Sequence, residues 1–387
     1  MISVKEAEKL IAASFSGWES EELILEDCIG KLLMQNVYAD RDYPPYHRVT
    51  MDGYAFHSGD ILERYPVSGI QLAGDVPVAF EKQTALEIMT GAALPAAADC
   101  VIPYEKCQLT EVDGIQYTIP EIALEPWRNI HTKGSDAENG SLLISSGTQI
   151  HSQHIAVAAS VGLKSLKVKK SPRILLVSTG DELSFEGSVL DHQIRPSNTI
   201  SIQSMLKGLG LNSEKRHLKD DSETMAKALE SALVQYDLFI FSGGVSKGKA
   251  DHLPHVLKSL GVEEVFHRIA QRPGKPLWFG KMDAKLFFGL PGNPISSATC
   301  FIKYVLPLIH RSEKRLVRLA KSIKRVKPLT HFVPAQLEVT DNEILATEVK
   351  NNGSGDFIST SKAHGFIELP PHETVFENGS MVSFYPF

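Results

Sequence analysis

The spacing of apolar residues divides the chain into segments of different character. Apolar residues recur at helical spacing between Val4 and Phe15, which predicts an amphipathic helix in a helical region that reaches to about residue 40. Residues 61–145 instead carry short apolar runs separated by turn residues, as β-strands do. Residues 148–163 return to a helical pattern. We therefore expect a β-rich insert bounded by helical segments.

Beyond residue 172 the pattern becomes an alternation of strands and helices. Apolar runs of the buried-strand type, such as 174–178 and 285–290, alternate with amphipathic segments such as 222–235. This alternation predicts a parallel, three-layer α/β domain. A basic linker over 311–327 is expected to lead to a last β segment. The predicted fold class is thus a multi-domain α/β protein.

Composition narrows the possible functions. The chain has 387 residues, with 40 Lys and Arg against 46 Asp and Glu, for a net charge of −6. Length alone suggests two to three domains. The acidic balance argues against nucleic-acid binding by bulk charge, which needs a basic surface. No apolar stretch approaches the roughly 18 residues of a membrane helix, and no signal peptide is recognisable. We expect a cytoplasmic protein with no membrane or nucleic-acid partner.

The four cysteines form no obvious framework. Cys28, Cys100, Cys107 and Cys300 contain no C-x-x-C pair. Cys100 and Cys107 could be zinc ligands, but no second pair at metal spacing follows them. Buried, neutral thiols in a reducing compartment are the favoured interpretation.

Candidate chemistry gathers in four loops of the predicted α/β domain. Ligands of open α/β sheets bind outside the carboxyl ends of the strands, which is where these loops are expected to lie. The loops are STGDE at 178–182, SGGVSKGKAD at 242–251, RPGKP at 272–276 and PGNP at 291–294.

The residue types in these loops suit a phosphorylated ligand. Adjacent glycines let a phosphate approach backbone N–H groups, and the second loop adds a hydroxyl from Ser246 and a charge from Lys247 or Lys249. Asp251 could bind Mg²⁺ or cap the helix that follows. Each loop alone is equally well explained as a tight turn. Together they predict a site in which Mg²⁺ bridges carboxylate and phosphate.

Other phosphate-binding classes lack support in the sequence. Neither GxxxxGK[ST] nor GxGxxG is present, which argues against P-loop NTPases and dinucleotide oxidoreductases. The chain also has no G-x-S-x-G and no HExxH motif.

Ordered motifs across the chain resemble one known family. They are MDGYA at 51–55, MTGA at 89–92, STGDEL at 178–183, SGGVSKGKAD at 242–251, RPGKP at 272–276 and GLPGNP at 289–294. The chain resembles the molybdopterin molybdenumtransferases, which are MoeA-type proteins related to the E domain of gephyrin, over nearly its whole length.

The resemblance implies four domains. Domain I is helical or extended and discontinuous, over 1–45 and 146–168, and domain II is the β-rich insert over 46–145. Domain III, over 172–312, is a MogA-like α/β domain with the pterin and nucleotide site. Domain IV, over 325–387, is a small β-barrel.

The resemblance also implies an activity and partners. The family acts in molybdenum cofactor biosynthesis, where Mg²⁺-dependent insertion of molybdate into adenylylated molybdopterin releases AMP. It implies a homodimer in which domain III of one subunit and domains II and IV of the other form each site. A MogA-type adenylyltransferase and molybdoenzyme maturation proteins are further implied partners.

Site residues follow from the four loops together with the family motifs. Asp52 and Thr90 are assigned by the resemblance alone, as groups that reach the site from the other subunit. The expected catalytic residues are Asp52, Thr90, Glu182 and Asp251. Metal binding is expected from Asp181 and Asp251, and molybdate binding from Arg272, Lys275 and Ser361. Phosphate and AMP binding is expected from Ser178, Gly180, Gly243, Gly244, Ser246, Lys247, Pro291, Gly292 and Asn293.

The chain departs from the family pattern at several charged positions. His131 stands where the family usually has an arginine, and the usual GED reads Gly134-Ser135-Asp136. Arg272 replaces the usual first lysine of KPGKP, which keeps the charge and changes its geometry. The stretch around Pro334 lacks an arginine that the family often carries.

Two alternatives to the molybdenum insertase remain open. The α/β domain alone would also suit an adenylyltransferase that makes the adenylylated pterin from ATP. A binding or scaffold protein that kept the fold and lost activity would be consistent with the missing cations.

Overall fold

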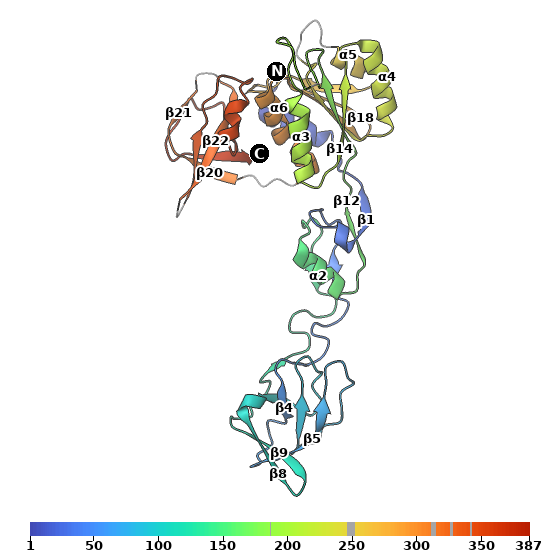
Figure 1. Ribbon diagram of the computed structural model, residues 1–387, viewed down its shortest axis with the longest axis vertical. Coiled ribbons are helices and arrows are strands. Elements are labelled where there is room, and N and C mark those ends of the chain that lie inside the picture. Colours follow the sequence, from blue (N-terminus) through green and yellow to red (C-terminus); the bar gives the residue numbers. More distant parts are fainter. Residues whose placement is uncertain (186, 246–251, 311–314, 326–327, 341–342) are drawn as a thin grey trace. The chain divides into compact units, whose positions relative to one another are not determined.

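The computed structural model describes residues 1–185, 187–245, 252–310, 315–325, 328–340 and 343–387 (Figure 1). The chain divides into two compact units. The insert unit is Ser20–Lys169, and the main unit is Met1–Glu19 with Lys170–Phe387. No helix among the described residues is both long and apolar enough to cross a membrane.

A six-stranded sheet in the insert unit confirms the predicted β-rich insert. Its order is β7-β4-β6-β5-β9-β8. The β8–β9 hairpin turns at Asp113 and Gly114, both with positive φ. The strands are β4 (Gly53–Phe56), β5 (Tyr65–Gln71), β6 (Ala85–Ile88), β7 (Cys100–Pro103), β8 (Cys107–Val112) and β9 (Ile115–Pro120).

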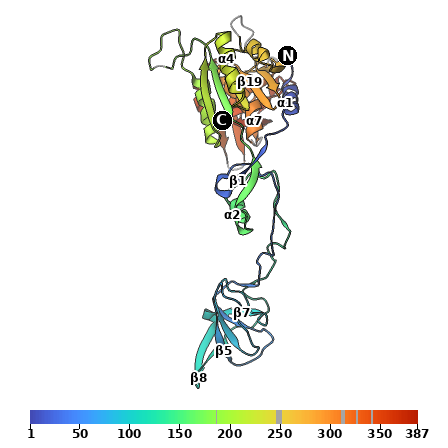
Figure 2. The ribbon, with the colours of Figure 1, turned by 90° about the vertical axis from the view of Figure 1, so that its right-hand side faces the viewer.

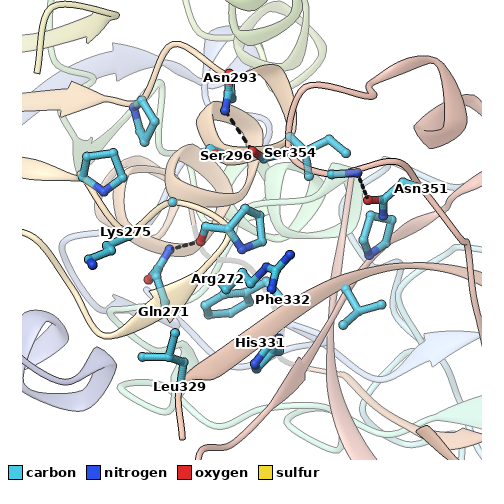
Figure 3. Close-up of a pocket in the computed structure, with 18 of the residues that line it drawn as sticks. Gln271, Arg272, Lys275, Asn293, Ser296, Leu329, His331, Phe332, Asn351 and Ser354 are labelled. Atoms are coloured by element: carbon cyan, nitrogen blue, oxygen red, sulfur yellow. Dashed lines mark hydrogen bonds between the residues drawn. The ribbon is translucent and has the colours of Figure 1, made fainter. Parts of the chain in front are cut away.

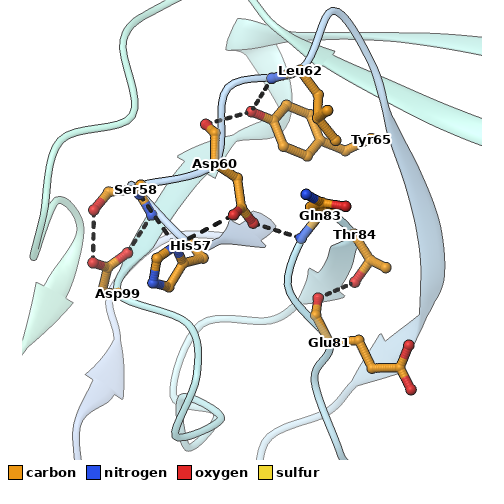
Figure 4. A network of polar contacts seen from close by, with 10 residues as sticks. His57, Ser58, Asp60, Leu62, Tyr65, Glu81, Gln83, Thr84 and Asp99 are labelled. Atoms are coloured by element: carbon orange, nitrogen blue, oxygen red, sulfur yellow. Dashed lines mark hydrogen bonds and ion pairs between the residues drawn. The ribbon is translucent and has the colours of Figure 1, made fainter.

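Two loops beside this sheet are tied together by aspartates (Figure 4). Asp99 accepts hydrogen bonds from the Ser58 backbone N–H at 2.6 Å and from its hydroxyl at 2.7 Å. Asp60 accepts from the Gln83 N–H at 2.5 Å and lies 3.6 Å from His57 Nδ1. The Ser58 hydroxyl donates to a carboxylate, so these hydrogen bonds hold the loops together.

The rest of the insert unit packs around a small apolar core. Its helix is α2 (Ser152–Ser160), within the range predicted from the sequence. The helical region expected up to residue 40 is wrong beyond Ala13, because residues 20–24 form a strand and residues 25–27 a single 3₁₀ turn. The strand pairs are β1 (Ser20–Ile24) with β12 (Ser165–Lys169), β2 (Val37–Tyr38) with β11 (Leu142–Ile144), and β3 (Arg48–Val49) with β10 (Ile130–His131).

The main unit contains the predicted three-layer α/β domain. Its sheet has the order β14-β13-β15-β19-β18-β16, with the first four strands parallel and β18 antiparallel to both of its neighbours. The strands are β13 (Ile174–Thr179), β14 (Ser213–Leu218), β15 (Leu238–Ser242), β16 (Glu263–His267), β18 (Trp278–Met282) and β19 (Lys285–Leu290).

Alternate strand residues pack on opposite faces of this sheet. Leu175 and Phe239 join α4 (Ser222–Leu233) and α5 (Leu253–Ser259) in one core. Leu176 and Ile240 join α3 (Ser197–Gly208) and α6 (Pro294–Cys300) in the other. A π-helical turn over Phe301–Val305 connects α6 to α7 (Leu306–Ile309).

The N-terminal helix packs with the main unit, although the resemblance implies that it belongs to domain I. Helix α1 (Val4–Ala13) begins with a capping box of Ser3 and Glu6. Its buried face, including Ala7 and Ile11, packs in the α/β core (Figure 2). The sequence predicts an apolar face correctly but carries no information about which domain covers it.

The C-terminal β domain is a closed barrel, as expected. Strands β22-β23-β20-β26-β24 form a ring because β24 pairs with β22. The predicted basic linker is wrong, since β20 and β21 lie within 311–327, and the barrel begins before residue 325. The strands are β17 (Gln271–Arg272), β20 (Arg315–Leu319), β21 (Ile323–Lys324), β22 (Thr330–Val339), β23 (Ile344–Glu348), β24 (Gly365–Leu369), β25 (Val375–Phe376) and β26 (Met381–Pro386).

One carboxylate ties the starts of two core strands together. Asp237, just before β15, accepts hydrogen bonds from Arg173 N, Nε and Nη2 at 2.9, 3.1 and 2.8 Å. These bonds, with the Arg173 charge, hold the pKa of Asp237 below its usual value. A lowered folded-state pKa stabilises the fold above the unfolded-state pKa, and this stabilisation disappears as pH falls through the folded-state value.

We expect Asp237→Asn to lower the free energy of unfolding at pH 7 by about 1 kcal/mol, since Arg173 is half exposed and solvent screens the pair. The difference from the unsubstituted chain should shrink towards pH 3 in urea unfolding. Glu223→Gln, at an exposed pair on α4, is the control and should change little. If the free energies of unfolding of the variant and the unsubstituted chain differed equally at pH 7 and pH 3, the stabilisation would not come from the Asp237 charge.

Candidate active site

Loops from four strands meet at one edge of the α/β sheet. Because β13, β15 and β19 are parallel neighbours, the residues that follow them lie side by side. Strand β18 is antiparallel to β19, with Trp278 opposite Gly289, so the 272–276 loop that precedes β18 lies at the same edge. The prediction that these loops share an edge is therefore confirmed.

Asn198 in the first turn of α3 links two of these loops. Its Nδ2 donates to Ser242 Oγ at 2.9 Å and to the Gly292 carbonyl at 2.7 Å. The Gly243 N–H donates to the Leu290 carbonyl at 3.1 Å, which joins the same loops through the backbone. The sequence analysis missed Asn198, because only the fold brings the start of α3 to this edge.

A pocket of about 1060 Å³ opens between this edge and the barrel (Figure 3). Five of the predicted residues line it, namely Arg272, Lys275, Pro291, Gly292 and Asn293. The opposite wall comes from β22 and from residues that follow β23. Strand β17 pairs with β22, which places Arg272 opposite His331. Asn293 Nδ2 donates to Ser354 Oγ at 2.8 Å across the pocket rim.

The charges on the pocket wall are mainly positive. Arg272, Lys275, Arg325 and Lys350 line it, with Glu348 as the carboxylate among its lining residues. Both Arg272 and Lys275 are exposed. The sequence analysis missed Arg325, Lys350 and Ser354, since nothing in their local sequence shows that the barrel brings them to the α/β domain. A pocket with this lining favours an anionic ligand.

Buried side chains fix the 272–276 loop, which carries Arg272 and Lys275. Gln271 is 1% exposed, accepts a hydrogen bond from the Tyr304 hydroxyl and donates to the Pro273 carbonyl at 2.9 Å. Gly274 has a φ of +90°, and a Cβ there would lie 2.5 Å from Gln271 Nε2 and 2.6 Å from Cys300 Sγ. The glycine is therefore required by both backbone conformation and space.

The glycine loop after β15 covers an unpaired hydroxyl. Gly243 and Gly244 have positive φ, and a Cβ on either would approach Thr179 Oγ1 within 3.1 Å. Thr179 is 4% exposed, and its hydroxyl has no hydrogen-bond partner among the described residues. Gly243 also adjoins Gly292, since a Cβ on Gly292 would lie 3.9 Å from Gly243 Cα. Gly243 and Gly244 neighbour the pocket without lining it.

The remaining predicted residues of the first loop have different surroundings. Ser178 is buried, and its hydroxyl lies 3.1 Å from His217 Nδ1. Asp181 and Glu182 are exposed, and Glu182 folds back over Gly180, where a Cβ would lie 2.5 Å from its Oε2. Two exposed carboxylates beside a phosphate-type loop fit Mg²⁺, which proteins often bind through one or two carboxylates plus substrate phosphates.

Ser361 does not line the pocket that Arg272 and Lys275 line. It lines a second, smaller pocket of about 560 Å³, formed by α3, α6 and the 3₁₀ turn Ile358–Lys362. Ser354 is the serine that the structure places beside Asn293. Three other predicted residues, Ser246, Lys247 and Asp251, lie outside the described residues.

In the insert unit, Asp52 and Thr90 form a pair. The Thr90 N–H donates to Asp52 Oδ1 at 2.7 Å, and this bond with the Thr90 side chain lowers the pKa of the exposed Asp52. Asp52 is thus held as a carboxylate. Nearby, His131 lies 3.0 Å from an Arg48 nitrogen and 2.7 Å from Asp136, so Arg48 supplies a cation beside the position where the family usually has arginine.

Comparison with known proteins agrees with this architecture. Three family descriptions match in order: "MoeA N-terminal region (domain I and II)" over residues 2–162, "Probable molybdopterin binding domain" over 175–311 and "MoeA C-terminal region (domain IV)" over 317–387. The crystal structure of a molybdopterin biosynthesis MoeA protein from Pyrococcus horikoshii is similar, with a TM-score of 0.84 and 29% identity, covering 100% of this chain and 99% of the other.

Relatives that match this chain over nearly their whole length share one name. A molybdopterin molybdenumtransferase from Synechocystis is 36% identical over 398 residues, covering 100% of both chains. One from Bacillus subtilis is 30% identical over 402 residues, covering 98% of this chain and 93% of the relative. With its matching domains, its closed barrel and its cation-lined pocket, this chain belongs to the MoeA-type molybdopterin molybdenumtransferases, enzymes of molybdenum cofactor biosynthesis.

Proposed function

We propose that this enzyme inserts molybdate into adenylylated molybdopterin and releases AMP. The observation that carries the proposal is the pocket between the α/β edge and the barrel, where cations and amide and hydroxyl donors gather in a chain whose net charge is −6. Its volume of about 1060 Å³ suits a ligand larger than a single oxyanion.

The chemistry of each group of residues suggests which part of the substrates it binds. Arg272 and Lys275 bind molybdate, because a dianion gains most from charge-assisted hydrogen bonds. The Gly243–Gly244 loop, with Thr179 beneath it, accommodates phosphate oxygens close to the backbone. Asp181 would hold Mg²⁺, which neutralises phosphate charge when bound. In the cleavage of the phosphoanhydride, an oxygen of water or molybdate forms a bond to one phosphorus while the bond from that phosphorus to the bridging oxygen breaks. Attack at the pterin phosphorus releases AMP with the bridging oxygen, and attack at the adenylyl phosphorus releases AMP with the incoming oxygen.

We propose that the exposed Asp52–Thr90 pair completes the site from the second subunit of a homodimer, while the barrel and the α/β edge come from one chain. This division differs from the one that the resemblance implies, in which the barrel comes from the other subunit. Asp52→Asn keeps the shape and the Thr90 N–H bond but removes the charge, so we expect the transfer rate to fall about tenfold or more with unchanged stability. Because the pKa of Asp52 is lowered, the rate of the unsubstituted enzyme should not titrate with this group near neutral pH.

A mixing experiment tests the shared site. When Asp52→Asn and Arg272→Gln chains are refolded together, a heterodimer has one intact site if each site draws on both subunits. We expect an equal mixture to recover about a quarter of the normal activity. Recovery of none would place Asp52 and Arg272 in the same subunit's site or outside it.

The function itself is tested by supplying purified protein with adenylylated molybdopterin, Mg²⁺ and molybdate. The proposal predicts stoichiometric AMP and a cofactor that activates an apo-molybdoenzyme. Formation of adenylylated molybdopterin from ATP and molybdopterin, without the insertion reaction, would favour the adenylyltransferase alternative. Absence of both reactions would favour a scaffold role. A separate adenylyltransferase must supply the substrate if insertion is the only reaction.

A further inference from the structure

Two cations on the barrel side of the pocket have no assigned role. Arg325 follows β21, where its backbone N–H donates to the Thr374 carbonyl at 2.7 Å. Lys350 follows β23 and is exposed. Both line the pocket that also contains Arg272 and Lys275.

Lys350 lies next to the position where the sequence lacks a cation. Pro334 lines the same pocket in β22, and its carbonyl accepts a hydrogen bond from the Val349 N–H at 2.8 Å. Lys350 is the residue after Val349, so its side chain extends from the backbone next to this hydrogen bond. The barrel wall keeps a positive charge near Pro334 although residue 334 itself has none.

The hydrogen bonds of Arg325 leave donors for a ligand. Its Nη2 donates to Glu348 Oε1 at 2.7 Å and its Nη1 to the Lys324 carbonyl at 3.3 Å. An arginine has five N–H donors, and the buried Nε of Arg325 has no partner among the described residues. The side chain is 20% exposed, so it is fixed by packing while it reaches the pocket surface.

Arg325 and Lys350 are arranged as one side of a two-sided binding site for a dianion. The pocket is lined by cations from both the α/β side and the barrel side, and Glu348 accepts a hydrogen bond from the Arg325 guanidinium, which orients it. A fixed guanidinium binds tetrahedral oxyanions through paired N–H groups. A single carboxylate leaves the wall with a positive balance.

We infer that Arg325 and Lys350 form the barrel-side arm that binds the tetrahedral dianion of the reaction, with Glu348 as a positioning residue. The inference rests on the proposed function and adds residues to that site. The dianion is molybdate or a phosphate of the nucleotide, which share this chemistry.

Isothermal titration of the full chain with molybdate and, separately, with AMP tests the inference. We expect Arg325→Gln and Lys350→Gln each to weaken the binding of at least one dianion about tenfold. The matched control is Arg318→Gln, since Arg318 forms a similar pair with Glu343 at 2.8 Å on the same barrel and does not line this pocket. The Arg318→Gln variant should bind molybdate and AMP with unchanged affinity. The dianion that weakens identifies the bound species.

A second variant separates binding from folding. Arg325→Gln alone leaves Glu348 without its partner, whereas Arg325→Gln with Glu348→Gln removes both charges and keeps the packing. The double variant should unfold at a normal temperature and still bind about tenfold more weakly. Normal affinity for both dianions in the Arg325 and Lys350 variants, with affinity lost in Arg272→Gln, would overturn the inference and leave the proposed function intact. An unsubstituted chain that binds neither dianion would overturn both.

Discussion

Replacement of Arg272 and Lys275 by glutamine is expected to lower the rate of molybdenum transfer at low molybdate by about 100-fold. Each side chain can supply a charge-assisted hydrogen bond worth about 1.5 kcal/mol or more, and 1.36 kcal/mol corresponds to tenfold in rate. Both side chains are exposed on a loop held by Gln271 from below, so the substitutions remove charge without disturbing the loop. Most of the loss should appear in the KM for molybdate, because glutamine is polar but uncharged and so removes the attraction that binds the dianion.

The control uses a lysine of the same sheet away from the pocket. Lys281 on β18 pairs with Glu263 at 3.6 Å and does not line the pocket. Lys281→Gln should transfer molybdenum at the normal rate. If Lys281→Gln slowed molybdenum transfer as much as the substitutions of Arg272 and Lys275, net charge, and not the pocket, would control the reaction.

Lys303→Met is expected to lower the free energy of unfolding by about 3 kcal/mol, the largest effect on stability that we predict. Lys303 lies in the π-helical turn and is 7% exposed. Its ammonium contacts Glu8 at 2.7 Å, Glu368 at 3.0 Å and the Tyr385 hydroxyl at 2.7 Å. Burial alone would lower the pKa of Lys303, but these neighbours raise it above its usual value, so the charge persists.

The size of the effect follows from what the substitution leaves behind. Methionine fills a similar volume but leaves the partly buried Glu368 without its counter-charge. The same ammonium joins α1, the α/β domain and the barrel, and it lies 5.7 Å from the ring of Phe332, a pocket residue. We therefore expect weaker substrate binding as well as lower stability.

Chemical unfolding of Lys303→Met and Lys227→Met provides the comparison. Lys227 pairs with Glu223 at 2.6 Å on the surface of α4, with both side chains more than 70% exposed, and its loss should cost less than about 0.5 kcal/mol. Equal stability of the two variants would show that the buried network contributes no more than a surface pair.

The α/β half of the site could be predicted because it depends on strand order and loop composition. Apolar runs alternating with helices indicate parallel strands, and parallel strands bring their carboxyl ends to one edge. Arg272, Lys275 and the 291–293 loop were grouped on that basis, and the structure brings them into one pocket.

The barrel half could not be predicted in the same way. Arg325 lies in a segment whose charges suggest a linker, and Lys350 lies in the last β segment. The pairing of β17 with β22 brings the barrel to the α/β edge. Ser361 is assigned only by the resemblance to the family, whereas the hydrogen bond from Asn293 identifies Ser354 as the serine at the rim. Long-range strand pairing leaves no local sequence signal.

The packing of the N-terminal helix with the main unit also has no local signal. Helix α1 has a clear apolar face, but a face of this kind fits either neighbouring domain. The Asp52–Thr90 contact joins two motifs 38 positions apart, and it is visible only after β4 and β6 pair. The family motifs identified both residues, and the structure adds the reason that Asp52 remains charged.

The position of molybdate in the crystal tests the central claim most directly. Crystals of the full chain grown with molybdate and AMP should give a molybdenum anomalous peak within hydrogen-bond distance of Arg272 or Lys275, in the pocket that the α/β edge forms with the barrel. A peak beside Ser361 in the smaller pocket, or no ordered molybdenum at a concentration that supports the reaction, would contradict the account.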